Sequence, residues 1–533
     1  MKKAFLNIWT LATVLILSAC GGGAQSLQVD STVPVSDENR VIYQMNVGAF
    51  TSEGTFQAAM QRLDRLDILG VDIIWLMPIY PRGETMHSPY AAMDYKAVNP
   101  SYGTIDDVKA FVSRAHELGM KVWLDWVPNH TATDATWVTT HPEYYVKSGN
   151  GIMHPNNYGD VYQLDYSNAD LCKAMTDCLK FWIDQTDIDG YRCDYISSSY
   201  IPASYWQTTI PEIKGYKRGK TITFLGEANI AGDATRLKTV GFDYDYAWSF
   251  QTSLVRFGAS GVYTASLKTN VDKLITAQSD ISFGRMVYLT NHDQNFNERE
   301  KTLTDKYGDN RYPLTVLVGT AWGMPLIYNG QEVGGNQALD YFHDTKIDWT
   351  NPDTKMYHTL RTLSALKHAV PAFQDGATID AHHTLTWLTA NSQNVLAYTC
   401  QYGDSEALVV LNFGTTAVCA SVSGITAGDW SLWLDSQTIS QGVSRKQVTL
   451  SETNDFELEA KGYQVYVKGS FSEEKLGEEP TNLSHVQRRY IPNDTIYSLS
   501  GRAMDHCSLM PSGIYIQNGR KIIYRKRGQD NRL

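Results

Sequence analysis

The stretch KVWLDWVPNH, residues 121–130, sets the architecture of this chain. Its first part, Lys121–Val127, is apolar at five of its seven positions and does not alternate, as in a strand that is covered on both faces of a parallel sheet. The preceding segment has the apolar period of an amphipathic helix, with Thr104 where an N-cap belongs and Gly119 where a C-cap belongs. The order predicts a helix over 105–118 that leads into a buried strand.

Seven other apolar runs have the same character and are separated by amphipathic segments. They are Val41–Val47, Asp72–Met77, Gly190–Tyr195, Ile222–Glu227, Phe242–Ala247, Met286–Thr290 and Pro325–Tyr328. Eight strand-then-helix units in about 330 residues predict an α/β fold of the (β/α)8 barrel type, a TIM barrel, over 41–376. An open doubly wound sheet is the alternative, but no Gly-rich phosphate loop follows the first strand.

The N-terminal residues have the features of an export signal. Lys2 and Lys3 precede a short apolar run, which ends in Leu17-Ser18-Ala19-Cys20. This ending resembles a bacterial lipobox, so residues 1–20 are predicted to be a lipoprotein signal peptide with Cys20 as the lipidated residue. An ordinary cleavable signal is the alternative. Residues 21–40 are predicted to form a flexible tether. We therefore expect an exported protein, lipid-anchored to a bacterial membrane in the cell envelope, with the outer membrane as the expected site.

The remaining segments predict additions to the barrel. Residues 130–165 lack a strong helical period and are predicted to form an excursion after the third strand. Residues 377–469 alternate apolar runs with turn residues, which predicts an antiparallel β-sandwich. A linker at 470–480 precedes a basic tail at 481–533. The tail has β-like pieces at Thr495–Leu499 and Gly513–Ile516, and it resembles small sorting modules of exported Gram-negative proteins.

The net charge and the cysteine spacing argue against two kinds of ligand, nucleic acid and zinc. The chain has 46 Lys+Arg against 57 Asp+Glu, a net charge of −11, which argues against nucleic acid as a partner. No cysteine sits in a CxxC pair, so a zinc site is not expected. Buried or idle thiols are the main interpretation of the cysteines, and Cys400 with Cys419 is the one pair considered for a disulfide. We expect a monomer without an organic cofactor.

Carboxylates stand where four predicted strands end. They occur in Asp125–His130, Gly190–Asp194, Phe224–Ala228 and Leu289–Asp293. Because the carboxyl ends of barrel strands meet at one rim, these side chains are expected to converge. Crowding of like charges raises proton affinity, which allows one carboxyl to remain an acid while another is ionised. Cleavage of a glycosidic bond requires that division of roles.

These four motifs, in this order, resemble the signature regions of the α-amylase family of glycoside hydrolases over about 41–469. The stretches Gln163–Asn168 and Gly323–Glu332 also resemble parts of that family. The resemblance implies that Asp194 is the nucleophile and that Glu227 is the general acid and then the base. It implies that Asp293 binds sugar hydroxyls and stabilises the transition state, with retention of anomeric configuration.

The resemblance implies further site residues. Arg192 would keep Asp194 ionised, His130 and His292 would bind sugar hydroxyls, and Tyr90 would offer an aromatic platform. A calcium ion could bind Asn129 together with oxygens of the excursion.

One departure and several activities remain open. Many members of the family have Lys-His shortly after the nucleophile, whereas Asp194 is followed here by Tyr195-Ile196-Ser197. This puts the contact to the leaving group in doubt. The short N-terminal tether and the modest excursion favour an endo-acting α-amylase on starch-like α-1,4-glucans and maltooligosaccharides. A glucanotransferase, a neopullulanase and an α-glucosidase are alternatives, and a non-catalytic glucan-binding protein is less favoured because all three carboxylates are present.

Overall fold

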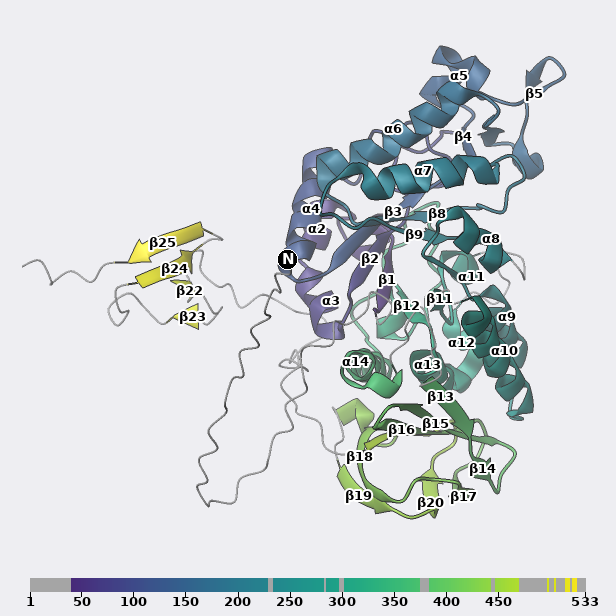
Figure 1. Ribbon diagram of the computed structural model, residues 1–533, viewed down its shortest axis with the longest axis vertical. Helices are drawn as coiled ribbons and strands as arrows, with labels where there is room; N and C mark the ends of the chain where they lie inside the picture. Colours follow the sequence, from purple (N-terminus) through teal and green to yellow (C-terminus); the bar gives the residue numbers. More distant parts are fainter. Residues whose placement is uncertain are drawn as a thin grey trace, which may run out of the picture.

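The structure is a computed structural model of the chain (Figure 1). It describes residues 40–228, 233–281, 284–296, 302–373, 383–441 and 446–468, together with four short strands between 496 and 524.

A closed barrel of eight parallel strands forms the centre of the molecule. The strands are β1 (Ile42–Met45), β2 (Ile73–Leu76), β3 (Lys121–Trp126), β8 (Gly190–Cys193), β9 (Thr223–Gly226), β10 (Tyr244–Tyr246), β11 (Gly284–Val287) and β12 (Met324–Tyr328). The last strand pairs with the first, with Ile42 opposite Leu326, so the sheet has no edge. The predicted barrel is confirmed, and the open doubly wound sheet is excluded.

The seventh strand begins and ends earlier than predicted. The sequence indicated Met286–Thr290, whereas β11 spans Gly284–Val287. The carbonyl of Leu289 accepts hydrogen bonds from the side chains of Gln251 and Tyr307, at 3.2 and 2.9 Å, instead of joining the ladder. An apolar residue that is buried by helices looks the same in sequence as one that is buried in a strand.

Large aromatic side chains fill the barrel interior. Trp75, Trp123, Tyr246 and Tyr288 form one buried cluster with Met286 and aliphatic residues of the other strands. The barrel is therefore a packed core rather than a pore. Its side chains nearest the carboxyl ends of the strands form the floor beneath the loops at that end.

Helices surround the barrel (Figure 1). The predicted helix at 105–118 is α4 (Ile105–Glu117), and a capping box between Thr104 and Asp107 begins it. Gly119 follows with φ +82°, a left-handed conformation that favours glycine. The other long helices are α6 (Ala169–Thr186), α7 (Ala203–Tyr216), α9 (Trp248–Phe257), α10 (Ala265–Ile281), α13 (Arg311–Thr320) and α14 (Thr354–Ala369). Shorter ones are α1 (Val47–Phe50), α2 (Phe56–Met60), α3 (Leu63–Leu69), α5 (Thr136–Thr140), α8 (Asp233–Val240), α11 (His292–Phe296) and α12 (Leu303–Tyr307).

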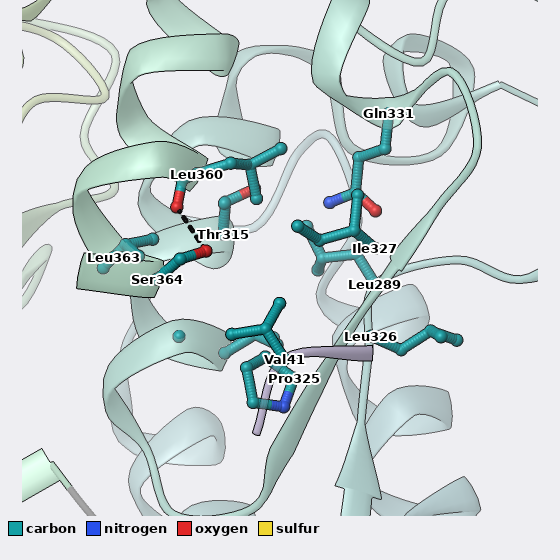
Figure 2. A pocket seen from close by; sticks show the side chains of 12 residues that line it. Val41, Leu289, Thr315, Pro325, Leu326, Ile327, Gln331, Leu360, Leu363 and Ser364 are labelled. Atoms are coloured by element: carbon teal, nitrogen blue, oxygen red, sulfur yellow. Dashed lines mark hydrogen bonds between the residues drawn. The ribbon is translucent and has the colours of Figure 1, made fainter. Parts of the chain in front are cut away.

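A small apolar cavity lies between the barrel wall and two of these helices. Figure 2 shows Val41, Pro325 and Ile327 on its barrel side, facing Leu360 and Ser364 of α14. Ser364 Oγ donates a 3.0 Å hydrogen bond to the carbonyl of Leu360, so it is satisfied within its own helix. A volume of about 20 Å³ holds roughly one water molecule, which makes this cavity a packing void and not a binding site.

The predicted excursion follows β3. It contains β4 (His130–Ala132) paired antiparallel with β7 (Val161–Gln163), and a hairpin of β5 (Lys147–Ser148) and β6 (Gly151–Ile152). His130 stands directly opposite Gln163 in the β4–β7 ladder. The excursion thus begins and ends beside the carboxyl end of a barrel strand.

The C-terminal domain is the predicted antiparallel sandwich. One sheet has the order β13-β15-β16-β21-β18-β19 and the other β14-β17-β20. These strands are β13 (His383–Trp387), β14 (Thr389–Ala390), β15 (Val395–Tyr402), β16 (Ser405–Asn412), β17 (Val418–Ser423), β18 (Gly428–Asp435), β19 (Lys446–Leu450), β20 (Thr453–Leu458) and β21 (Tyr463–Lys468). Buried hydroxyl contacts, Tyr398 with Thr320 and Tyr463 with Thr359, join the sandwich to α13 and α14.

The tail forms a four-stranded sheet of β22 (Ile496–Tyr497), β23 (Ala503–Met504), β24 (Gly513–Gln517) and β25 (Arg520–Tyr524). The two pieces predicted from sequence correspond to β22 and β24, and the other two strands were missed.

The structure contradicts the considered disulfide and does not describe the predicted signal peptide. Cys400 is buried, Cys419 is exposed and both are free thiols, so the considered disulfide is wrong. The signal peptide, the tether to residue 39 and Cys20 lie outside the described residues. In the part of the chain that is described, no helix has both the length and the apolar character needed to cross a bilayer.

A substitution of Gly190, at the start of β8, tests how tightly the barrel wall is packed. A Cβ there would lie 2.5 Å from the carbonyl oxygen of Thr223 and 2.6 Å from Trp123 Cδ1. We expect Gly190→Ala to lower the free energy of unfolding by about 1–3 kcal/mol, the usual cost of overpacking. Gly215 in α7 has open space around it, so Gly215→Ala is the matched control and should be neutral or slightly stabilising. Thermal unfolding of both variants checks this, and equal stabilities would contradict the packing account.

Candidate active site

A cavity of about 400 Å³ lies at the carboxyl ends of the barrel strands, beside the excursion. The predicted residues that line it are Tyr90, Asn129, His130, Asp194, Glu227, His292 and Asp293. The three carboxylates therefore meet in one cleft, as the order of motifs predicted. Arg192, the remaining predicted site residue of the barrel, is fully buried among them.

The guanidinium of Arg192 links the carboxyl groups. Its Nη1 lies 2.9 Å from Asp125 Oδ1 and 2.9 Å from Asp194 Oδ1, and its Nη2 lies 2.8 Å from Glu227 Oε2. Asp194 and Glu227 are thus neighbours across one planar cation. Since one positive charge faces three carboxyl groups, the cluster favours a state in which at least one of them is protonated.

Aromatic rings enclose the same guanidinium. Its central carbon lies 5.0 Å from the ring centroid of Trp75, 5.6 Å from Tyr246 and 5.7 Å from Tyr90. The Tyr246 hydroxyl also accepts a 2.9 Å hydrogen bond from Arg192 Nε. These rings exclude water and stabilise the cation through their faces, which fixes Arg192 in position.

Burial gives the two neighbouring carboxyls different proton affinities. It raises the pKa of Glu227 to about 8, with Asp194 and Asp293 adding to the rise and Arg192 opposing it. It raises the pKa of Asp194 to about 6, against the lowering effect of Arg192. Crowding was predicted as the cause, but burial is the larger effect. Near neutral pH, Glu227 can therefore hold a proton while Asp194 is ionised, and Arg192 supports that ionised form as expected.

The residue after Asp194 has an unusual backbone. Tyr195 has φ +42°, which is a costly conformation for a non-glycine residue, and its N–H donates a 2.9 Å hydrogen bond to Glu227 Oε2. This bond lowers the pKa of Glu227 and so partly opposes the effect of burial. The turn at Tyr195 therefore holds the carboxyl group of one strand beside the end of another.

The two predicted histidines are neutral hydrogen-bonding groups. Burial lowers the pKa of both His130 and His292 to about 4. His292 Nδ1 lies 2.7 Å from the Gln44 side-chain amide, and its ring stacks on Tyr90 with centroids 5.1 Å apart. His130 Nε2 lies 3.2 Å from the carbonyl oxygen of Tyr90. Neutral rings held in this way suit recognition of sugar hydroxyls.

The residues around Asn129 do not fit a calcium ion. Both its backbone oxygen and its side-chain oxygen accept hydrogen bonds from Gln163 Nε2, at 2.8 and 3.1 Å. Calcium prefers several oxygen ligands that include carboxylates. Within the ranges that the structure describes, no group of three or more His, Cys, Asp or Glu residues could hold a metal ion.

Sequence reasoning missed Tyr246 and Gln44, and it placed Asp125 at the rim without giving it a role. Asp125 stands in a motif at a strand end and binds Arg192, and it also accepts a hydrogen bond from the Tyr90 hydroxyl at 3.0 Å. Its position five residues before His130 was a usable signal. Tyr246 and Gln44 carry no such signal, because an inward-facing polar residue on a strand looks like ordinary barrel core.

Fold and site together define a (β/α)8-barrel protein whose cleft holds neighbouring carboxyls with different proton affinities. The catalytic domain of alpha-amylase matches residues 30–163 and 156–365. The chain therefore belongs to the alpha-amylase family of glycoside hydrolases.

Individual relatives are distant. The alpha-amylase MalA of Haloarcula japonica is 26% identical over 418 residues, which cover 74% of this chain and 58% of that protein. A cyclomaltodextrin glucanotransferase of Klebsiella oxytoca is 24% identical over 450 residues, which cover 70% of this chain and 67% of that protein. The crystal structure of the noncanonic maltogenic alpha-amylase AmyB from Thermotoga neapolitana shares the fold, with a TM-score of 0.66 and 24% identity. The matched region covers 80% of this chain and 98% of the Thermotoga chain.

Arg192→Met tests the central cation. Leaving buried carboxyls without their partner should cost about 3–5 kcal/mol of stability. Arg192 lowers the pKa values of Asp125, Asp194 and Glu227, so its removal raises all three further. A carboxyl with a raised folded-state pKa loses stability as pH rises through that value, so the loss should be larger at about pH 8 than at about pH 5.

Arg114→Met, which breaks ion pairs on α4 that lie near the surface, is the control and should cost about 1 kcal/mol or less at either pH. Chemical denaturation at the two pH values measures both variants. A loss for Arg192→Met that is no larger than the control would show that the cluster does not depend on this cation.

Proposed function

We propose that this protein is a retaining, endo-acting hydrolase of α-1,4-glucosidic bonds in starch-like glucans, an α-amylase. One observation carries the proposal: Asp194 and Glu227 bind the two terminal nitrogens of one guanidinium, and burial gives them separated pKa values. An ionised carboxylate beside a protonated one is the pair that cleaves a glycosidic bond.

In the proposed reaction, Asp194 attacks the anomeric carbon and forms a covalent glycosyl-enzyme, while Glu227 gives its proton to the leaving oxygen. Glu227 then removes a proton from a water molecule that attacks the anomeric carbon. The bond from that carbon to Asp194 breaks, which releases the sugar with its configuration retained and restores the Asp194 carboxylate. Asp293, 3.6 Å from His292 Nε2, would bind hydroxyls of the reacting glucose and stabilise positive charge on the ring. His130 and His292 would hold the same sugar, and Tyr90 would pack against it.

The rim of the cavity supports a chain-like substrate. Met86 and Tyr158 line it and are 53% and 62% exposed, which is high for large apolar side chains. Tyr341 and Phe342 line another part of the same cavity and stack on each other with centroids 4.9 Å apart. The exposed ring of Tyr158 beside a polar cleft suits the apolar face of a further glucose unit.

Transfer to a sugar acceptor is the second candidate. The Klebsiella relative that aligns over 70% of this chain is a cyclomaltodextrin glucanotransferase. The carboxyl pair serves both reactions, and they differ in whether water or a sugar hydroxyl enters the site.

Two isosteric substitutions test the proposal. Asp194→Asn removes the nucleophile and Glu227→Gln removes the transferable proton, so each should lower turnover on soluble starch by about 10³-fold or more with an unchanged circular dichroism spectrum. Asp177→Asn and Glu212→Gln, in surface ion pairs of α6 and α7, are matched controls and should keep full activity.

The product pattern of the wild-type protein separates the candidates. Mixed oligosaccharides early in the reaction support endo hydrolysis, glucose alone from the start contradicts it, and cyclic or elongated products indicate transfer. Near-native activity of either site variant would overturn the assigned roles.

We also propose that lipid on Cys20 holds the exported protein at a bacterial membrane. Cys20→Ser should release the protein from the membrane fraction and abolish labelling by a radioactive fatty acid, because the thiol that would carry the lipid through a thioether bond is lost. Cys419→Ser, at an exposed free thiol, is the control and should keep the label. Equal labelling of wild type and Cys20→Ser would contradict the anchor.

A further inference from the structure

We propose that the side-chain amide of Gln163 takes the place of a bound cation at the joint between the barrel and the excursion, and so positions Asn129 and His130 without a metal. Gln163 would thus be a positioning residue for the cavity. The catalytic role of Gln163 rests on the proposed function, but thermal unfolding tests the inference without any measurement of activity.

Three oxygens converge on one nitrogen. Gln163 Nε2 lies 2.8 Å from the Asn129 carbonyl oxygen, 3.1 Å from Asn129 Oδ1 and 3.2 Å from the Leu164 carbonyl oxygen. These are hydrogen-bond distances, longer than the roughly 2.3–2.6 Å at which oxygens bind calcium. An NH2 group has two protons for these three acceptors, so it is saturated.

The chemistry of the acceptors fixes the orientation of this amide. All three partners are carbonyl oxygens without protons, so the Gln163 oxygen in the same place would meet only repulsion. Gln163 Oε1 is itself buried and has no hydrogen-bond partner in the described part of the chain. The side chain is placed by its donor end, and an unsatisfied acceptor is tolerated at the other.

The convergence occurs in a buried place. Gln163 and Asn129 are each 1% exposed. Three oxygen dipoles aimed at one buried point require positive charge there. The amide hydrogens supply partial positive charge without the cost of burying a full charge.

The joint connects directly to the cavity. Gln163 lies at the end of β7, opposite His130 of β4, and the Leu164 N–H donates to the Asn129 carbonyl oxygen at 3.2 Å. Asn129 Nδ2 in turn lies 3.2 Å from His130 Nδ1. A change at Gln163 therefore reaches the ring of His130, which lines the cavity, through two contacts.

Gln163→Glu is the decisive variant. It replaces the donor with carboxylate oxygens, which the three carbonyl oxygens repel unless a cation enters between them. We expect the purified variant to unfold at least about 3 °C below wild type in EDTA and to recover most of that loss in millimolar CaCl2. Wild type should unfold at the same temperature in EDTA and in CaCl2.

Two other variants separate this account from a general packing role. Gln163→Leu lacks both donor and charge, so it should be destabilised and unaffected by calcium. Gln251→Glu is the matched control, because Gln251 is also a buried amide, and among the described residues its Nε2 donates to a single carbonyl, that of Leu289. It should be destabilised without calcium rescue, since one carbonyl oxygen does not form a cation site.

Calcium rescue confined to Gln163→Glu, with a wild type indifferent to chelation, supports the proposal. A wild type that loses stability in EDTA and regains it with calcium would overturn it, as would Gln163→Glu matching wild type in EDTA. Thermal unfolding reports these outcomes whether or not the protein cleaves starch, so a failure here is distinct from a failure of the proposed function. For catalysis, we expect Gln163→Leu to raise KM for maltooligosaccharides more than it lowers kcat.

Discussion

The positive charge of Arg192 is the feature on which the site depends. Its guanidinium binds Asp125, Asp194 and Glu227 inside a ring of Trp75, Tyr90 and Tyr246. In a buried place of this kind, carboxyl groups without a cation would all be neutral, and with a cation for each they would all be ionised. One shared cation gives the intermediate case, in which an ionised carboxylate stands beside a protonated one.

The closed barrel makes that sharing possible. Residues that are far apart in sequence, at the ends of β3, β8 and β9, reach one guanidinium because parallel strands in a closed sheet present their carboxyl ends at one rim. The Tyr195 turn and the Gln163 amide then position two parts of the site that the strands alone do not hold. The first holds Glu227 by a backbone N–H, and the second holds Asn129, the residue before His130 of β4.

Much of this architecture could be predicted from the sequence, because burial on both faces leaves continuous apolar runs that are easy to recognise. The convergence of Asp194, Glu227 and Asp293 followed from strand order alone. The end of β11 could not be predicted, since Leu289 is buried by side chains of α9 and α12 rather than by strand pairing. The contact of Gln163 with Asn129 joins residues 34 positions apart, and nothing local in the sequence marks it. The sequence predicted that one carboxyl of the site has a raised pKa. Burial of Glu227, rather than crowding of like charges, is the larger cause of that rise.

The pH dependence of kcat/KM on a maltooligosaccharide tests the shared-cation account most directly. Asp194 must be ionised to attack and Glu227 must be protonated to donate, so the rate should fall below about pH 6 and again above about pH 8. A profile that is flat across this range, or whose acidic limb lies near the ordinary aspartate pKa of about 4, would contradict the claim that burial around one arginine sets the two proton affinities.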